Sequence, residues 1–168
     1  KRFFLIGKQG EPDGFMETCI HEELSDKPMT MRDYFGDSLG ITYYYRHPRS
    51  YARRSIFSID EPSPTVRGVN QPMPDGYQIH NNDSIKSKES IRPLTTIERS
   101  YIQTFPKEFK FFGTKTDMEQ MIGNAVPVNL ARYVAEAILK YVNGKAYQDE
   151  QLMQTSLSVV AKDSEHYV

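Results

Sequence analysis

Turn-forming residues recur so often between positions 36 and 91 that no long helix or strand is expected in the middle of this chain. The segment 71–76 (QPMPDG) cannot be regular, because proline lacks a backbone donor and glycine favours turns. Residues 81–90 are polar and are expected to form a mobile loop. Short β-prone pieces lie at 41–45, 55–59 and 65–69. The middle therefore predicts a small, loop-rich, mostly β unit, a format that often carries binding residues.

Ordered elements are expected on the N-terminal side of this unit. Residues 3–7 (FFLIG) are a short apolar run ended by glycine, which predicts a buried strand. A chain that begins directly on a core strand looks truncated at its N-terminus. A short helix is expected at 29–35, with Thr30 or Ser25 as its N-cap.

A helix is expected directly after the loop-rich unit. Thr95 and Glu98 have the spacing of a capping box, and Ile97, Tyr101 and Ile102 follow at helical spacing. The dipeptide at 105–106 (FP) should end this helix.

Two more helices are expected further along the chain. The first is short, at 118–122, and should stop at Gly123. The second should begin at Pro127 and end at Gly144, leaving a weakly patterned tail from Lys145. Its apolar stripe consists of Val128, Ala131, Val134, Ala135, Ile138 and Val142.

The net charge of −1 gives no overall bias toward nucleic acid, but basic residues are concentrated in one short run. This run contains Arg46, Arg49, Arg53 and Arg54, interleaved with Tyr45, His47 and Tyr51. Guanidinium groups bind phosphates and guanine edges, and aromatic rings stack on bases or sugars. The run is therefore either a nucleic-acid contact or a solvated basic surface.

Several other classes of protein are disfavoured. A single cysteine, Cys19, excludes an internal disulfide framework and is compatible with a reducing cytoplasm. No run approaches the roughly 20 apolar residues of a membrane span, and the first residues do not resemble a signal peptide. Neither a membrane nor a metal partner is expected.

Two blocks near the C-terminal end carry a more specific signal. The first is residues 92–98 (RPLTTIE) followed by 102–106 (IQTFP), and the second is 123–128 (GNAVPV) followed by the apolar helix. In this order and at this separation they resemble the last two motifs of DNA cytosine-5 methyltransferases. The chain departs from the pattern at Ile97, where family members usually have arginine.

Two further segments extend the resemblance to roughly residues 1–142. Residues 1–7 (KRFFLIG) look like the end of a family motif in which arginines precede an apolar strand. Residues 60–66 (DEPSPTV) resemble the distal part of the family's target recognition domain. Arg92 and Thr95 are expected to organise the framework of that domain.

The resemblance implies an α/β fold, namely the C-terminal part of a Rossmann-like methyltransferase with a small, mostly β recognition domain. In this family a cysteine attacks C6 of a cytosine flipped out of double-stranded DNA, and C5 receives a methyl group from S-adenosyl-L-methionine. The motif with that cysteine is absent here, as is the motif with the family's glutamate, and Cys19 is interpreted as an ordinary cysteine. The chain alone is therefore expected to be inactive, and to need the N-terminal catalytic half or to self-associate.

The resemblance also assigns roles at the reacting base and the cofactor. Arg2 matches the arginine that holds the flipped cytosine, and its alternative is a strand-edge arginine paired with a carboxylate. Asn124, Ala125 and Val126 match residues that wall the cofactor pocket, although Asn124 also fits a purely structural turn.

Contacts with DNA are expected from the loop-rich unit. Thr65 and Val66 match a pair that lies near the backbone of the flipped nucleotide. Arginine reads guanine and asparagine reads adenine, although most arginines at such interfaces bind phosphate. The candidates for sequence reading are Arg49, Arg53, Arg54, Arg67 and Asn70.

The expected layout has four parts. Residues 1–35 end the catalytic-domain sheet and connect to the recognition domain at 36–91; closing helices follow at 92–144, then a C-terminal tail at 145–168. The expected protein is a bacterial restriction-modification enzyme of the cytoplasm, associated with the nucleoid. The absence of an initiator methionine at Lys1 favours a fragment. The alternatives are the specificity subunit of a two-polypeptide enzyme, a catalytically inactive DNA-binding relative, an RNA-methylating relative, and an unrelated α+β domain.

Overall fold

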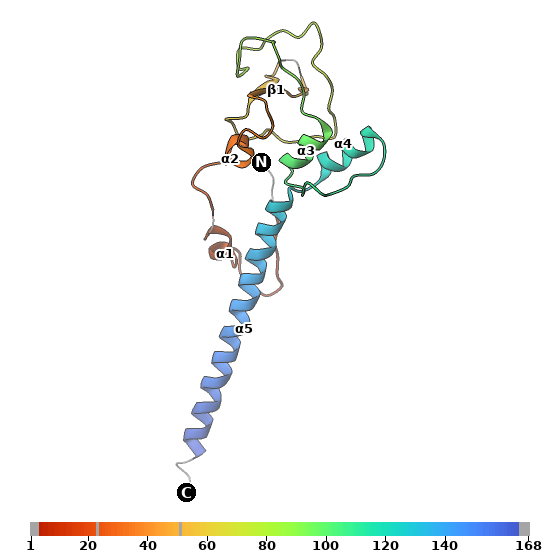
Figure 1. Ribbon diagram of the computed structural model, residues 1–168. Coiled ribbons are helices and arrows are strands. Elements are labelled where there is room, and N and C mark those ends of the chain that lie inside the picture. Colours follow the sequence, from red (N-terminus) through yellow and green to blue (C-terminus); the bar gives the residue numbers. More distant parts are fainter. Residues whose placement is uncertain (1–3, 23, 51, 165–168) are drawn as a thin grey trace. The chain divides into compact units, whose positions relative to one another are not determined.

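The computed structural model describes residues 4–22, 24–50 and 52–164, which fall into two compact units (Figure 1). The central unit is Ser25–Leu130, and the described part of the terminal unit is residues 4–22 and 24 together with 131–164. The elements are α1 (Glu17–His21), α2 (Met31–Phe35), β1 (Tyr43–Tyr45), β2 (Ile56–Ser58), α3 (Thr96–Ile102), α4 (Lys115–Asn124) and α5 (Val128–Ser164). Among the described residues, no helix has both the length and the apolar character needed to cross a membrane.

The sheet of the central unit is an antiparallel pair, in which Tyr44 of β1 lies opposite Phe57 of β2. These strands confirm the expected β pieces at 41–45 and 55–59, each shortened to three residues.

The third expected β piece, 65–69, is wrong, because this segment is not a strand. Its carbonyl groups accept hydrogen bonds from side chains rather than from a neighbouring strand. Arg46 donates to the Thr65 carbonyl at 2.8 Å, and Arg99 donates to the Arg67 carbonyl.

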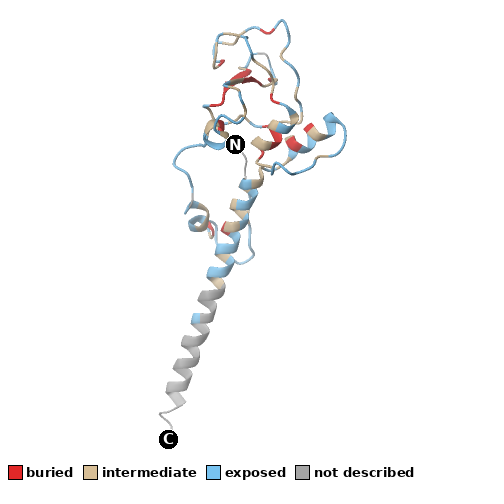
Figure 2. Ribbon diagram, viewed as in Figure 1, coloured by how far each residue is buried: buried red, intermediate tan, exposed pale blue. Residues whose placement is uncertain are grey.

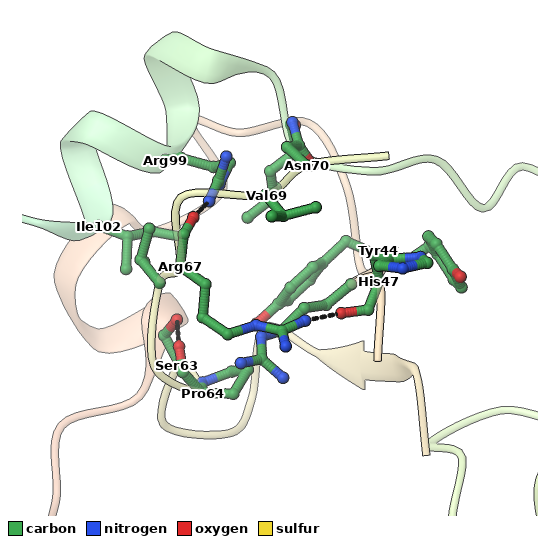
Figure 3. A pocket seen from close by; sticks show the side chains of 13 residues that line it. Tyr44, His47, Ser63, Pro64, Arg67, Val69, Asn70, Arg99 and Ile102 are labelled. Carbon is green, nitrogen blue, oxygen red and sulfur yellow. Dashed lines mark hydrogen bonds between the residues drawn. The ribbon is translucent and has the colours of Figure 1, made fainter. Parts of the chain in front are cut away.

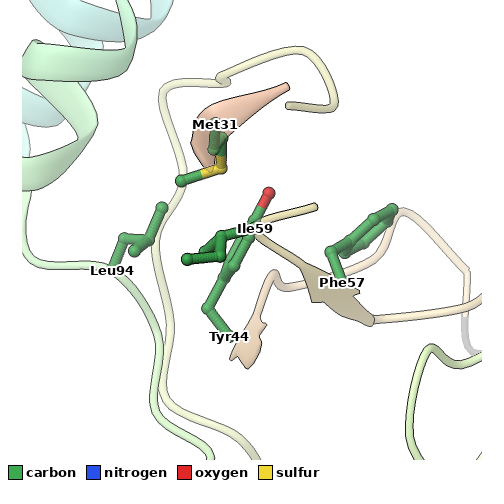
Figure 4. Packing of buried hydrophobic residues seen from close by; sticks show 5 residues of the cluster. All are labelled: Met31, Tyr44, Phe57, Ile59 and Leu94. Carbon is green, nitrogen blue, oxygen red and sulfur yellow. The ribbon is translucent and has the colours of Figure 1, made fainter. Parts of the chain in front are cut away.

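The main core of the central unit joins buried side chains from separate segments (Figure 4). They are Met31, Tyr44, Phe57, Ile59 and Leu94. The rings of Tyr44 and Phe57 stack with their centroids 6.0 Å apart. Burying one large apolar side chain contributes about 1.5–3 kcal/mol. The cluster therefore holds α2, both strands and the segment before α3 together, and Figure 2 shows the buried residues of this unit concentrated on the strands, α3 and α4.

α2 confirms the helix expected at 29–35 and shows Thr30 to be its N-cap. The Thr30 hydroxyl accepts from the Asp33 amide at 3.0 Å, and the Asp33 carboxylate accepts from the Thr30 amide at 2.9 Å. The Arg32 amide also donates to the Ile59 carbonyl at 2.8 Å, which fastens the helix to the turn after β2.

Asp83 lies in the segment expected to be a mobile loop, but it is buried and anchored. One carboxylate oxygen accepts from the amides of Ser55 and Ile56 at 2.8 and 3.0 Å. The other accepts from the Tyr77 hydroxyl at 2.6 Å and from the His80 amide at 2.8 Å. Burial would raise the pKa of Asp83, but these hydrogen bonds outweigh it and lower the pKa. A single carboxylate therefore ties residues 77–83 to the start of β2.

α3 begins with the capping box expected from the sequence. The Thr95 hydroxyl accepts from the Glu98 amide at 3.2 Å, and the Glu98 carboxylate accepts from the Thr95 amide at 2.7 Å. Arg92 reaches the same carboxylate with both guanidinium ends, at 2.6 and 2.7 Å. Arg92 and Thr95 therefore both stabilise the framework at the start of this helix.

α4 is longer than the helix expected at 118–122. A second capping box, in which the Thr114 hydroxyl accepts from the Asp117 amide at 3.2 Å, begins the helix earlier. Gly123 was expected to stop the helix, and this is wrong because it lies within α4. A Cβ at Gly123 would lie 2.2 Å from the Gly68 nitrogen and 2.4 Å from the Arg67 carbonyl carbon. The glycine therefore permits a close approach of two backbones.

A buried ion pair joins α3 to α4. Arg99 pairs with Glu119, and their side chains are only 7% and 4% exposed. The same carboxylate accepts from the Thr96 hydroxyl at 2.7 Å and from the Asn70 amide at 3.1 Å. Burial lowers the pKa of Arg99 to about 10, with a further contribution from two neighbouring guanidinium groups. Arg99 still carries its charge at neutral pH, so Glu119 is its required counter-ion.

The terminal unit packs α5 against the N-terminal segment. The ring of Phe15 lies edge-on to that of Tyr141 at 5.0 Å, and Lys145 donates to Glu11 at 2.7 Å. Hydrogen bonds from Lys145 and then Tyr141 lower the pKa of Glu11 to about 2.

Two expectations about this unit are wrong. Residues 4–7 of the expected strand are not a strand, and Leu5 is fully exposed. In the part of the chain that the structure describes, only β1 and β2 are strands, so this segment has no neighbour with which to form a ladder. α5 also continues past Gly144, because an internal glycine costs a helix only about 1 kcal/mol and no proline follows it in the sequence.

We predict that Asp83→Asn loosens the attachment of residues 77–83. Loss of charge-assisted hydrogen bonds should cost about 2 kcal/mol, so the amides of Ser55 and Ile56 should exchange with solvent at least tenfold faster in NMR hydrogen exchange. The matched control is Asp75→Asn, because Asp75 is exposed in the same unit. A lowered pKa means that the contribution is present above the unfolded value of about 3.9 and is lost as the pH falls through the folded value. Equal exchange in both variants would contradict the anchoring role.

Breaking the ion pair of Arg99 and Glu119 should destabilise the central unit more strongly than Asp83→Asn does. Glu119→Gln leaves the Arg99 charge buried without its counter-ion, and we expect it to lower the free energy of unfolding by about 3–5 kcal/mol in urea titrations. Glu136→Gln, which removes an exposed partner of Arg132, should cost less than about 1 kcal/mol. The double variant Arg99→Met/Glu119→Leu should recover much of the loss. A Glu119→Gln cost no larger than that of Glu136→Gln would refute the role of the pair.

Candidate functional site

The two sequence blocks meet at Gln103, which is only 3% exposed. Its side-chain amide donates to the carbonyls of Ile122 and Ala125, at 2.7 and 3.1 Å. These carbonyls lie at the end of α4 and in the turn that follows it. A side chain of the first block therefore fixes the backbone of the second.

The same region of the first block also caps α5. The Val128 amide donates to the Gln103 carbonyl, and the Asn129 amide donates to the Thr104 hydroxyl, both at 2.9 Å. Thr104 has a positive φ of 58°, which is strained for a β-branched residue. It occupies the left-handed position after α3 that usually takes glycine. Threonine is used here because its hydroxyl satisfies a free amide of the next helix, a bond that the sequence reasoning missed.

The three predicted cofactor residues lie at the end of α4 and in the turn between α4 and α5. Asn124 ends α4 with its side chain exposed, Ala125 is extended at φ −64° and ψ 147°, and Val126 is 43% exposed. Among the described residues, the Asn124 side chain has no hydrogen-bond partner, so it does not stabilise the turn itself. Their contact with a cofactor stays a prediction.

Most of the predicted DNA-binding residues gather around one hollow of about 430 Å³. We call it the arginine hollow, and its lining residues are Arg46, Pro48, Arg49, Arg53, Arg54, Phe57, Thr65 and Arg67. The structure thus brings the run at 46–54 together with the segment at 65–67, although only the first was recognised as basic from the sequence. Arg46 belonged to that run but was not among the predicted site residues.

The arginines of the hollow differ in how firmly they are held. Arg54 stacks over the Phe57 ring at 4.2 Å and pairs with Glu61. Arg49 and Arg53 are exposed, and among the described residues their guanidinium groups have no hydrogen-bond or ion-pair partner. The loop that carries them therefore presents two uncommitted cations.

Arg46 and Arg67, the two inner arginines, are partly buried and join the segments that carry them. Arg46 donates to the carbonyl of Thr65, while Arg67 donates to the carbonyl of His47. Burial, and then the charge of Arg67, lowers the pKa of Arg46. Burial, and then the charge of Arg49, lowers the pKa of Arg67. No carboxylate lines the hollow, and among the described residues only Arg54 of its five arginines has a carboxylate partner, Glu61.

The other two predicted DNA contacts, Val66 and Asn70, do not line the hollow. Val66 is only 9% exposed and lines a second cavity. Asn70 lines this second cavity, of about 30 Å³, together with Arg99 and with the hollow residues Arg46 and Arg67 (Figure 3). Its amide donates to the Leu94 carbonyl at 2.8 Å and to Glu119. The adenine contact expected of Asn70 stays a prediction, and it would require the amide to give up these bonds.

Two other sequence predictions concern Arg2 and Cys19. Arg2 lies outside the described residues, so its contact with a flipped base stays a prediction. Cys19 is free and partly exposed. Within the described ranges, no group of three or more histidine, cysteine, aspartate or glutamate side chains is arranged to hold a metal ion.

Comparison with known proteins gives consistent matches. A model of the family described as C-5 cytosine-specific DNA methylase matches residues 1–140. Type II methyltransferase M.HindV of Haemophilus influenzae is 64% identical over 142 residues, which are 83% of this chain and 46% of that protein. Type II methyltransferase M.HgiDI of Herpetosiphon aurantiacus is 51% identical over 153 residues, which are 91% of this chain and 49% of that protein.

The chain thus spans about half the length of these curated relatives. No solved structure matches it. The family match and the two relatives confirm the resemblance inferred from the two sequence blocks, and the chain belongs to the C-5 cytosine-specific DNA methylase family.

Proposed function

We propose that this chain is the C-terminal part of a DNA cytosine-5 methyltransferase, and that it supplies DNA recognition and the closing motifs. The observation that carries this proposal is the bond of Gln103 to Ile122 and Ala125, which joins the two family motifs in the unit that holds the arginine hollow. The remaining half of the protein would complete a Rossmann-like α/β domain and supply the cysteine that attacks the base.

The substrate of the complete enzyme is double-stranded DNA. A hollow lined by five arginines and by no carboxylate favours a polyanion. Arg49 and Arg53 are the most available for contact with DNA, because their guanidinium forks are uncommitted and suit the acceptors of guanine or of phosphate. Arg54, Arg67 and Asn70 have partners inside the fold, which favours phosphate contacts or positioning for them. Thr65, which is exposed and precedes the buried Val66, would lie beside the backbone of the flipped cytosine, and Arg2 would hold the base itself.

Asn124, Ala125 and Val126 would form one edge of the cofactor pocket. An unpaired amide at Asn124 and a 43% exposed aliphatic side chain at Val126 fit the polar and apolar parts of S-adenosyl-L-methionine. When bound, this cofactor would supply the methyl group. The chain's own contribution would be to orient it, because the Gln103 bonds fix the carbonyls of Ile122 and Ala125 on either side of Asn124.

The relatives are named Type II methyltransferases and come from bacteria, so we place this protein in a bacterial restriction-modification system. Its site of action would be the nucleoid in the cytoplasm, where its DNA substrate lies.

The proposal predicts that methyl transfer requires both halves. Labelled methyl transfer from S-adenosyl-L-methionine to mixed-sequence DNA should be absent with the chain alone. It should appear when a polypeptide that corresponds to the other half of the M.HindV relative is added. Activity of the chain alone would overturn the proposal that the other half supplies the catalytic cysteine. DNA binding with no methyl transfer in either sample would instead favour a catalytically inactive DNA-binding relative.

In the same assay, Asn124→Ala should raise the KM for S-adenosyl-L-methionine about tenfold, the effect of removing roughly one hydrogen bond. The KM for DNA should not change. The matched control is Asn143→Ala, because Asn143 is an exposed asparagine on α5. If both variants behave alike, Asn124 is not a cofactor contact.

A further inference from the structure

The arginine hollow brings five positive charges together, and neighbouring carboxylates do not balance them all. Arg46 and Arg67 are partly buried, and burial together with a like charge nearby lowers the pKa of each. Glu61, the carboxylate that pairs with Arg54, does not line the hollow. A bound anion would relieve this repulsion.

The two inner arginines are also pre-organised. Arg46 and Arg67 each use part of the guanidinium fork to bind a backbone carbonyl of the opposite segment, at Thr65 and His47. This reciprocal bonding fixes the positions of both groups before any ligand arrives. Both residues also line the hollow. Fixed donors of this kind bind without losing the rotational freedom of a long side chain.

The chemistry of the lining selects the class of ligand. Guanidinium groups only donate, so a ligand in the hollow must offer acceptors and tolerate several donors at once. Cytosine and adenine edges present amino donors, which would be left unpaired beside these groups, while a guanine edge offers acceptors but no negative charge. A phosphodiester group offers only acceptors together with a negative charge, and arginine forks match its geometry.

We propose that the arginine hollow is a preformed site for one phosphodiester group of the DNA backbone, with Arg46 and Arg67 as fixed ligands and Arg49 and Arg53 closing on it. The identity of the anion as DNA rests on the proposed function. The anion site itself does not, because inorganic phosphate has the same binding chemistry.

The first experiment uses inorganic phosphate as the probe. The arginine Nε–H signals of the full chain are followed by NMR during a phosphate titration at constant ionic strength. Signals of Arg46 and Arg67 should shift in a saturable manner, while that of Arg132, an exposed arginine on α5, should not. Arg46→Gln should abolish the shift at Arg67. Absence of a shift, or an equal shift at Arg132, would overturn the site.

The second experiment uses DNA and avoids disturbing the fold. Arg49→Gln/Arg53→Gln removes two side chains that hold nothing else in place among the described residues, and Arg132→Gln is the matched control. The slope of log Kd against log salt concentration should fall by roughly 1, the contribution of the one phosphate proposed for the hollow, and by the same amount for different duplex sequences. An unchanged slope with weaker discrimination between sequences would mean that these arginines read bases, and would overturn their role at the phosphate.

The two experiments separate this inference from the proposed function. Saturable phosphate shifts at Arg46 and Arg67 with no DNA binding would uphold the anion site and remove DNA as its ligand. Methyl transfer by the completed enzyme without phosphate shifts would uphold the methyltransferase and remove the anion site.

Discussion

The buried pair of Arg99 and Glu119 is the interaction on which the central unit depends. An unpaired charge in such a place would be costly, so each group commits the element that carries it to the position of the other. Glu119 draws in Thr96 and Asn70, while Arg99 holds the carbonyl of Arg67. The segment that leads into the arginine hollow is therefore positioned by the same pair that joins α3 to α4.

The two family motifs are joined to each other by hydrogen bonds and form one structural unit. Gln103 holds the turn after α4, and the carbonyl of Gln103 and the hydroxyl of Thr104 satisfy the first amides of α5. Gly123 lets α4 approach the backbone at Gly68 more closely than any side chain would permit. The motifs thus connect the segment that lines the hollow to the residues expected at the cofactor, through the buried Gln103 side chain, the Thr104 hydroxyl and the close backbone contact at Gly123.

Sequence reasoning succeeded where a local rule or a specific motif applied. The capping boxes at Thr30 and Thr95 depend on neighbours three residues away; the box at Thr95 was predicted from the sequence, and Thr30 was one of two candidate N-caps. The roles of Asp83 and Glu119 could not, because their partners are distant in the chain and a lone carboxylate has no local signature. The expected strand at 65–69 failed for a related reason, since arginine side chains from elsewhere took its carbonyls. The hollow could be predicted only in part. Four of its arginines form a run in the sequence, but Arg67 joins them through a tertiary contact between residues 65–67 and 46–54.

Arg49 and Arg53 differ from the other polar side chains of the central unit in how freely they could change during evolution. Almost every other polar side chain discussed for the central unit supports a second element, so its replacement would need a compensating change elsewhere. These two side chains support nothing else among the described residues. Mutation at either position is therefore nearly neutral for folding, and a lineage can exchange them one at a time. Under the DNA-binding role proposed for these two arginines, the affinity for DNA could therefore change during evolution without loss of folding.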